Sequence, residues 1–204
     1  MTLTRRTLIA ASLSASLSAL ALPAAAQQLS LDEISAYLNG FTTGQGGFTQ
    51  INGDGTISTG TIYIKRPGRI RFEYAPPDDA MFIAGGGQVA VFDARSNEEP
   101  QRYPLNQTPL SIILEANVDL ARRNMVTGHT SDGTTTTVTA QDPDHPDYGS
   151  IQLVFTANPV ELRQWLVSDD TGSQTTVILN DVQTGVQIGD RLFNIQAELA
   201  DWNP

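Results

Sequence analysis

Residues 61–77 read TIYIKRPGRIRFEYAPP, and this stretch decides the fold class. Pro-Gly stands at its centre, where proline fixes φ and glycine accepts a positive φ, so a tight turn is predicted there. On both sides of the turn, large apolar side chains alternate with polar ones, which is typical of half-buried β-strands. The stretch therefore predicts a β-hairpin with one apolar face and one polar face.

The alternation assigns each side chain of this hairpin to a face. The apolar face receives Ile62 and Ile64 before the turn, and Ile70, Phe72 and Tyr74 after it. The opposite face receives a polar set, which we expect to be exposed to solvent and partly paired within itself: Lys65, Arg69, Arg71 and Glu73.

Arg66 differs from the other cations of the hairpin, because it continues the row of Ile62 and Ile64 toward the apolar side. An arginine at the rim of an apolar cavity needs acceptors, and the carbonyl groups at the C-terminal ends of helices are well suited to it. Alternatively, Arg66 is a turn residue whose guanidinium lies in water. The residues alone leave both interpretations open.

The same alternation recurs in short runs along the chain, separated by turn sequences such as Asn-Gly-Asp-Gly and Gly-Gly-Gly. Such runs predict an antiparallel meander. We find no repeat and no linker, so the fold class is mainly β in a single domain. The predicted strands occupy residues 47–52, 56–66, 69–75, 80–85, 88–94, 100–105, 125–130, 134–141, 150–157, 160–169, 174–182 and 191–195.

The segment SLDEISAYLNGF, residues 30–41, predicts an amphipathic helix of about three turns. Ser30 and Glu33 have the spacing of a capping box, in which each side chain satisfies a free N–H group at the helix start. Ile34 and Leu38 recur at helical spacing and give the helix an apolar face.

A second helix is predicted over residues 107–124, with Thr108 as its cap and Pro109 at its first position. Its apolar patch consists of Leu110, Ile113 and Leu114. Two apolar helices over one apolar sheet face either form a packed core or close a hydrophobic cavity. The alternation of side chains does not choose between these two outcomes.

The N-terminus has the parts of a secretory signal peptide in order. Arg5 and Arg6 precede an uncharged stretch, and a run of small residues ends at Ala26, where we expect cleavage. The arginine pair fits both the general and the twin-arginine export signal, so the export route stays open. The sequence therefore predicts a signal peptide over residues 1–26, a mature domain over residues 27–204 and a location in the bacterial periplasm.

The chain is acidic. Its 204 residues carry a formal net charge of −10, which becomes −12 when the two arginines of the signal peptide leave. This charge argues against nucleic acid as a partner, because phosphates need a basic surface, and against docking on anionic lipid headgroups. The absence of Cys removes disulfide chemistry, thiolate chemistry and lipid anchoring through an N-terminal Cys.

The sequence offers little support for catalysis. Its two histidines, His129 and His145, occur in neither a His-Glu-x-x-His nor a Gly-x-Ser-x-Gly context. The acidic stretch QDPDHPDYG, with Asp142 and Asp147 near its ends, is either a weak metal site or a rigid, solvated turn fixed by its two prolines. We expect no cofactor.

Five blocks of the chain carry a resemblance to a known family. In order, they read GFTQ, TGTIYIKRPGRIRFEY, FIAGGGQVAVFDA, YPLNQTPLSIIL and LRQWLVSDDTGSQTTVIL. Their order and spacing resemble the LolA family of periplasmic outer-membrane lipoprotein carriers. The resemblance implies a strongly curved antiparallel half-barrel of about eleven strands, closed by a lid of short α-helices over a hydrophobic cavity.

The resemblance also implies a function. Such carriers are not enzymes: they accept acylated lipoproteins from an ATP-driven ABC transporter of the inner membrane, shield the acyl chains and pass them to an outer-membrane receptor. We expect a monomer. The receptor of such a pathway is itself a lipoprotein with an N-terminal Cys, so a chain without Cys resembles the mobile carrier.

The residues of the expected site follow from the resemblance and from the alternation together. The lid-locking arginine of the family falls on Arg66, followed by Pro67, and a cavity-lining phenylalanine of the family is replaced here by Ile70. The expected hydrophobic cavity comprises Ile34, Leu38, Phe48, Ile62, Ile64, Ile70, Phe72, Tyr74, Leu110, Ile113 and Leu114.

Three alternatives remain beside the lipoprotein carrier. One is a carrier of another amphiphilic lipid on the same fold. The second is a hydrolase that uses His129 or His145. The third is an adaptor whose core is dry and completely filled.

Overall fold

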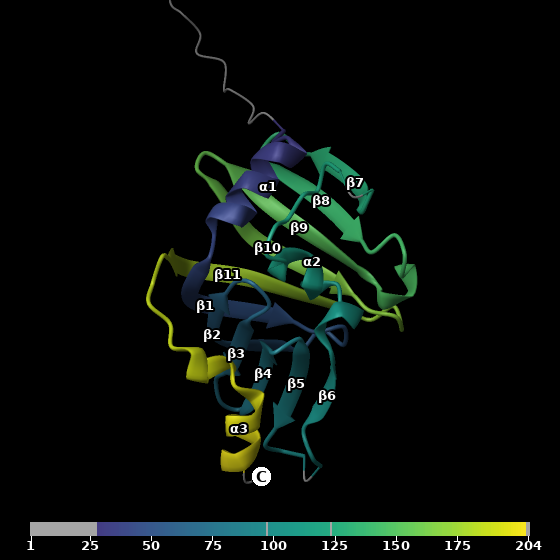
Figure 1. The fold of residues 1–204 in the computed structure, drawn as a ribbon. Coiled ribbons are helices and arrows are strands. Elements are labelled where there is room, and N and C mark those ends of the chain that lie inside the picture. The colour runs from purple at the N-terminus through teal and green to yellow at the C-terminus, as the bar shows by residue number, and fades with distance from the viewer. Residues whose placement is uncertain (1–27, 97, 123, 203–204) are drawn as a thin grey trace, which may run out of the picture.

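The computed structural model describes residues 28–96, 98–122 and 124–202, which form one antiparallel sheet carrying helices (Figure 1). The predicted signal peptide and its cleavage point lie outside the described residues. No helix of the described part is both long and apolar enough to cross a bilayer.

The sheet has eleven strands in the described residues, ordered β6-β5-β4-β3-β2-β1-β11-β10-β9-β8-β7. Two meanders, β1 to β6 and β7 to β11, are joined where β1 pairs with β11. The strands are β1 (Thr43–Ile51), β2 (Ile57–Lys65), β3 (Ile70–Tyr74), β4 (Ala80–Gly85), β5 (Gln88–Asp93), β6 (Gln101–Pro104), β7 (Val126–Ser131), β8 (Thr135–Gln141), β9 (Ser150–Ala157), β10 (Val160–Ser168) and β11 (Gln174–Thr184).

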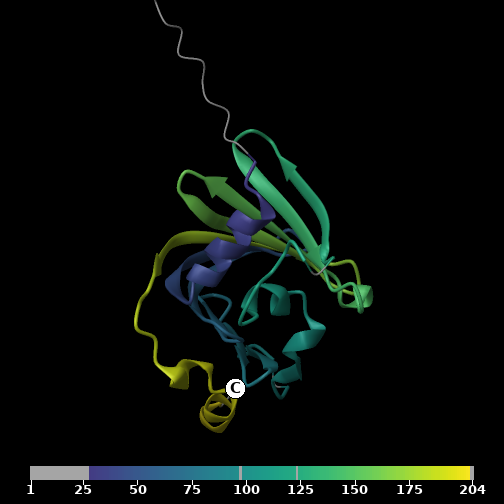
Figure 2. The ribbon, with the colours of Figure 1, turned by 45° about the horizontal axis from the view of Figure 1, so that its top comes forward.

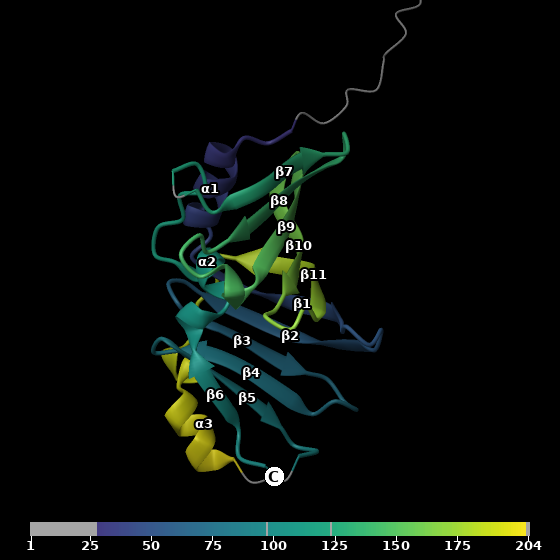
Figure 3. The same cartoon turned by 90° about the vertical axis from the view of Figure 1, so that its right-hand side faces the viewer.

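The sheet is strongly curved but does not close, since β6 and β7 stand at its two ends (Figures 2 and 3). Register shifts mark irregularities in β1–β11, β7–β8 and β9–β10, and such bulges increase local twist and bending. The predicted half-barrel of about eleven strands, mainly β and in one domain, is confirmed.

Helix α1 (Leu31–Gly40) begins with the predicted capping box. The Ser30 hydroxyl accepts from the Glu33 backbone N–H at 3.2 Å, and the Glu33 carboxylate accepts from the Ser30 N–H at 2.8 Å. The buried face includes Ile34 and Leu38, both less than 2% exposed. The helix lies over the concave side of the sheet near β7 to β10 (Figure 1).

The second predicted helix is wrong in its length and in its cap. Of the described residues in that range, only α2 (Leu110–Leu114) is α-helical, after the short 3₁₀ helix η1 (Leu105–Gln107), and Pro109 rather than Thr108 is its N-cap. The backbone of Glu115 turns to extended angles and ends the helix. Beyond it, Asn39 of α1 accepts from the Val118 N–H and donates to the Val118 carbonyl, both at 2.9 Å. These bonds replace the ones that a longer helix would make.

The predicted strand at residues 191–195 is also wrong. This segment forms η3 (Asp190–Phe193) and the start of α3 (Ile195–Asp201), because the Asn194 side chain accepts from the Ala197 N–H and caps a helix. A further 3₁₀ helix, η2 (Pro146–Tyr148), precedes β9.

The C-terminal segment, residues 186–202, covers the convex face of the sheet. In Figure 2 it lies outside the arc of strands, whereas α2 lies within the arc. Ile195 of α3 packs with Ile83, Ala90 and Phe92, whose neighbours in β4 and β5 face the concave side. Gly85 lets the Phe193 carbonyl approach the sheet, since a Cβ there would collide with it.

This cover corrects the expected solvent exposure of the polar face of the hairpin. Arg71 is only 7% exposed, and Lys65 and Arg69 are partly covered by the same segment. The expected pairing within this polar set is present between Arg71 and Glu73, at 2.7 Å.

Candidate ligand-binding site

Arg66 lies at the concave side of the sheet, where the sequence predicted it. Its side chain donates to the carbonyl of Phe41, which follows α1, at 3.4 Å, and to the carbonyl of Glu115, which follows α2. The residue is 8% exposed. One guanidinium therefore connects the C-terminal ends of α1 and α2 to the β2–β3 hairpin. We call these two concave-side helices the lid.

The backbone of the same turn strengthens this connection. The Arg66 N–H donates to the Thr42 carbonyl, and the Gly68 N–H donates to the Leu114 carbonyl, both at 2.8 Å. Gly68 has φ +70°, which a side chain would disfavour, and Pro67 is exposed at the outside of the turn. The Pro-Gly turn thus positions two backbone donors and one guanidinium against the lid.

Both of these hydrogen bonds of the Arg66 guanidinium end on neutral backbone carbonyls. Burial lowers the pKa of the Arg66 guanidinium, and the nearby Glu115 carboxylate partly offsets this effect. Within the described chain, its Nε atom is buried without a hydrogen-bond partner. Leaving a buried donor unpaired costs about 1–3 kcal/mol, so the hydrogen-bonding capacity of Arg66 is incompletely satisfied at the lid.

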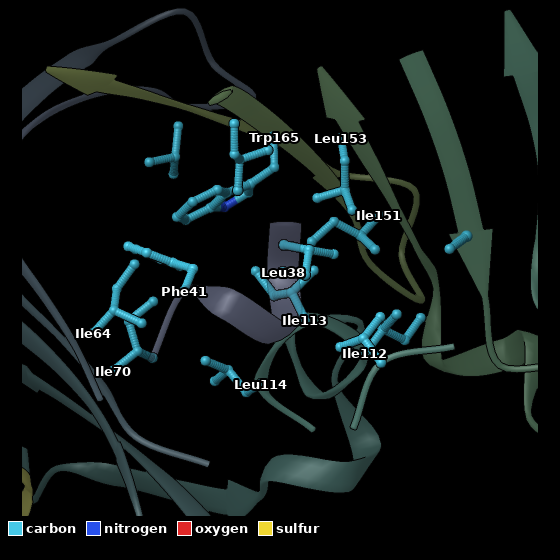
Figure 4. Close-up of a cluster of buried hydrophobic side chains, with 14 of the residues drawn as sticks. Leu38, Phe41, Ile64, Ile70, Ile112, Ile113, Leu114, Ile151, Leu153 and Trp165 are labelled. Atoms are coloured by element: carbon cyan, nitrogen blue, oxygen red, sulfur yellow. The ribbon is translucent and has the colours of Figure 1, made fainter. Parts of the chain in front are cut away.

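All eleven residues predicted to form the cavity belong to one apolar cluster or pack against it. Figure 4 shows Leu38 and Phe41 from the α1 side, Ile113 and Leu114 from α2, and strand side chains such as Ile70, pointing toward one another. Nine of the eleven are buried, and Tyr74 and Leu110 are partly buried. With the lid in this position, most of the predicted cavity is a packed core.

An open cavity of about 730 Å³ remains beside this core, at the start of α2. Three of the predicted residues line it: Phe72, Tyr74 and Leu110. Its volume falls within the range of about 300–1,000 Å³ that is usual for ligand pockets. The remaining eight predicted residues do not line it.

Sequence reasoning missed several aromatic side chains of this cavity. They are Phe82, Tyr103, Tyr148 and Trp165. Alternation did not predict that Trp165 faces the cavity, because the register shift between Leu162 and Gln164 reverses the alternation of faces beyond it. Phe72 contacts both Phe82 and Trp165 edge-to-face, at centroid distances of 5.6 and 6.3 Å.

Apart from three carboxylates, the polar side chains that line the cavity are uncharged. The Tyr74 hydroxyl donates to Gln50 Oε1 at 2.7 Å, and burial raises the pKa of Tyr74 to about 12. Tyr74 is therefore neutral at physiological pH.

The two histidines and the acidic loop contact nearby backbone groups and side chains of the fold. His129 Nε2 lies 2.8 Å from the Leu29 carbonyl, and the His145 ring stacks on Tyr148. Asp142 accepts from the N–H groups of Asp144 and His145 within its own turn. Among the residues that the structure describes, no group of three or more His, Asp or Glu side chains is arranged to hold a metal ion.

Comparison with known proteins now adds to this geometry. A family model described as "Outer membrane lipoprotein carrier protein LolA" matches residues 39–196. The chain belongs to this family. The match includes the β2–β3 hairpin, α2 and the cavity, and the resemblance drawn from the five sequence blocks is thereby confirmed.

Relatives named "Outer-membrane lipoprotein carrier protein" match over most of the chain. The protein of Chromohalobacter salexigens is 25% identical over 188 residues, covering 87% of this chain and 88% of that one. The protein of Ralstonia nicotianae is 26% identical over 185 residues, covering 83% and 84%. Among solved structures, a LolA superfamily protein from Nitrosomonas europaea matches 83% of this chain and 99% of its own, with 10% identity and a TM-score of 0.47. The family assignment rests on the sequence matches.

Proposed function

We propose that this protein is a periplasmic carrier that takes acylated lipoproteins from an ABC transporter of the inner membrane and delivers them to a receptor of the outer membrane. Membership of a lipoprotein carrier family supports the carrier role. The observation that carries the mechanism is the contact of Arg66 with carbonyls at both lid helices, above an apolar core.

The lid has to move for cargo to bind. Ile34, Leu38, Ile113 and Leu114 fill the concave face from the lid side and are at most 5% exposed. Acyl chains can reach the part of the sheet beneath the lid only where these side chains leave it. The exchange replaces one apolar partner by another, so the apolar surface of the sheet stays covered in both states.

The energies favour a carrier that holds its lid by a few polar contacts. Burying methylene groups gains about 0.8 kcal/mol each, so three acyl chains could gain several tens of kcal/mol gross, beyond the ceiling of about 18–21 kcal/mol for non-covalent affinity. A carrier must release its cargo, so opening should oppose this gain. Each charged hydrogen bond of Arg66 that opens costs about 1.5–3 kcal/mol.

We further propose that Arg66 and Pro67 form the lid-locking element and that the eleven predicted apolar residues receive the acyl chains once the lid has opened. The cavity of about 730 Å³ disfavours the adaptor with a completely filled core. The contacts of His129 and His145 are not contacts that activate a nucleophile, which disfavours the hydrolase.

Release from spheroplasts tests the carrier function. Spheroplasts retain mature lipoproteins in their inner membrane, and we expect purified residues 27–204 to release them into the supernatant as a soluble one-to-one complex. Bovine serum albumin at equal concentration controls for non-specific extraction. Absence of release with an active transporter of the same organism would contradict the proposal, and mass spectrometry of the co-purified ligand would then identify another lipid.

A further inference from the structure

The open cavity has an apolar floor that suits a hydrocarbon chain. Phe72 and Trp165, 4% and 1% exposed, meet there with Phe82, and Leu110 of α2 closes one side. The cavity above this floor is open while Arg66 still holds the lid. A first acyl chain can therefore enter here before the lid opens.

The mouth of the cavity carries charge of only one sign. Asp147 of η2 and Asp169 and Asp170 of the β10–β11 connection line it, and none of the described lining residues is Lys, Arg or His. Asp169 stabilises its own turn, because it accepts hydrogen bonds from the Thr171 hydroxyl and the Ser173 N–H. Asp147 and Asp170 are exposed, and in the described part of the chain no cation pairs with either.

Charges around a concave, apolar site act on a ligand more strongly than charges on a flat surface, because the low-dielectric walls focus the field. An acyl chain that reaches the floor leaves its head group at the mouth, beside Asp147 and Asp170. A neutral or cationic head group is tolerated or attracted there, and an anionic one is repelled.

We propose that the rim formed by Asp147 and Asp170 makes the cavity select acyl ligands by head-group charge, accepting neutral and cationic heads and rejecting anionic ones. This inference rests on the proposed carrier function and names the cargo class of the same site. An acylated protein N-terminus carries no obligatory negative charge next to its chains, whereas an anionic phospholipid does. The rim therefore lets the carrier approach a membrane without extracting anionic phospholipids.

The chain offers a direct reporter of entry into this cavity. It has two tryptophans, and Trp165 lines the cavity whereas Trp202 packs against Phe92 on the convex face. The Trp202 Nε1 atom is buried without a partner in the described residues, so Trp202→Phe removes an unsatisfied donor and leaves Trp165 as the reporter.

The experiment titrates the Trp202→Phe protein, residues 27–204, with three ligands of equal chain length below their micellar concentrations. They are dodecanoate, dodecanoylglycerol and dodecyltrimethylammonium, followed through Trp165 fluorescence. Unit charges about 4 Å apart in water interact by about 1 kcal/mol. The cation is attracted by about as much as the anion is repelled, so we expect dodecanoate to bind about thirtyfold more weakly than the cation at 10 mM ionic strength. The difference should disappear near 1 M salt, where the Debye length is about 3 Å.

Two double variants with the same change in net charge locate the effect. Asp147→Asn with Asp170→Asn should reduce the preference to about twofold or less. Asp181→Asn with Asp201→Asn, two exposed positions outside the cavity lining, should leave it unchanged.

Each other outcome overturns the inference. Equal binding of the three ligands at low salt would overturn charge selection and leave the carrier function standing. Equal loss of preference in both double variants would assign it to net charge rather than to the rim. Failure of dodecanoylglycerol to change Trp165 fluorescence would overturn this inference, while release from spheroplasts would still decide the carrier function.

Discussion

Two buried arginines stand five positions apart on the same hairpin and face opposite sides of the sheet. On the concave side, Arg66 donates to the backbone carbonyls of Phe41 and Glu115 at the ends of the lid helices. On the convex side, Arg71 contacts the carboxylates of Glu73 and Glu198 at 2.7 and 2.8 Å. Arg71 also donates to the Leu192 carbonyl at 2.9 Å.

The difference in acceptors indicates different tasks. The hydrogen bonds of Arg66 end on neutral carbonyls, so breaking them leaves no hydrogen-bonded carboxylate behind, and the contact of Arg66 suits repeated opening. A guanidinium between two carboxylates cannot leave without exposing unpaired charges in a partly buried site. The contact of Arg71 therefore suits a permanent attachment of the C-terminal segment. The two arginines of the hairpin thus bind two different segments, the lid on the concave face and the C-terminal segment on the convex face.

The largest effect should follow from breaking the convex contact. Arg71→Leu leaves Glu73 and Glu198 facing each other without their cation, beside a carbonyl that loses its donor. Removing one partner of a fully buried ion pair costs about 3–5 kcal/mol. Both glutamates are partly exposed, so we expect a loss of about 2–4 kcal/mol in the free energy of unfolding, measured by urea denaturation.

Arg163→Leu is the matched control for this variant. Arg163 pairs with Glu161 at 3.1 Å, but both side chains are about half exposed. Exposed pairs of this kind contribute about 0–1 kcal/mol. If Arg71→Leu were no more destabilising than the control, the two carboxylates would not form the attachment described here.

The same comparison shows how far the sequence alone could lead. Alternation within residues 61–77 placed Ile62, Ile64 and Arg66 on the concave face correctly, because side-chain direction along a strand is a local property. It also placed Arg71 on the opposite face. The expected solvation of Arg71 failed because its cover comes from Glu198, 127 positions away in the chain. No local pattern reports such a contact.

The candidate site was predictable to a similar extent. The apolar residues were identified, and Arg66 was linked to helix ends through alternation and the resemblance, but the position of the open cavity was not foreseen. Its position depends on α2 being only five residues long and on the bulge that turns Trp165 inward. Both features arise where tertiary contacts, such as Asn39 with Val118, replace regular hydrogen bonding.

A smaller effect on stability is expected from the concave contact. Arg66→Leu loses two charged hydrogen bonds but also removes the buried, unpaired Nε atom, so we expect a net loss of about 1–2 kcal/mol in the free energy of unfolding. The lid should nevertheless open more often. Hydrogen exchange of residues 31–40 and 110–114 should become severalfold faster, and cargo transfer to the receptor should fail.

Arg66→Lys sharpens this test, because an ammonium keeps the charge but cannot reach two separated carbonyls with a planar fork. We expect exchange rates between those of the wild type and Arg66→Leu. Unchanged exchange in the lid of Arg66→Leu, or normal transfer by that variant, would contradict the role of Arg66.

The smallest effect concerns the exposed end of the convex attachment, where Asp190 accepts from Lys65 and Arg69, both at 2.7 Å. The hydrogen bond and charge of Lys65 lower the pKa of Asp190 below its ordinary value. The stabilisation is therefore complete above the unfolded pKa, near about 3.9, and is lost as pH falls through the lower folded value. The hydrogen-exchange protection factors of residues 186–201, which correct for the intrinsic effect of pH on exchange, should fall below about pH 4 in the wild type. Asp190→Asn should remove that step. If the protection factors of the lid helices fell equally in this pH window, with the same dependence on Asp190, the two faces would open together. The distinction between Arg66 and Arg71 would then not hold.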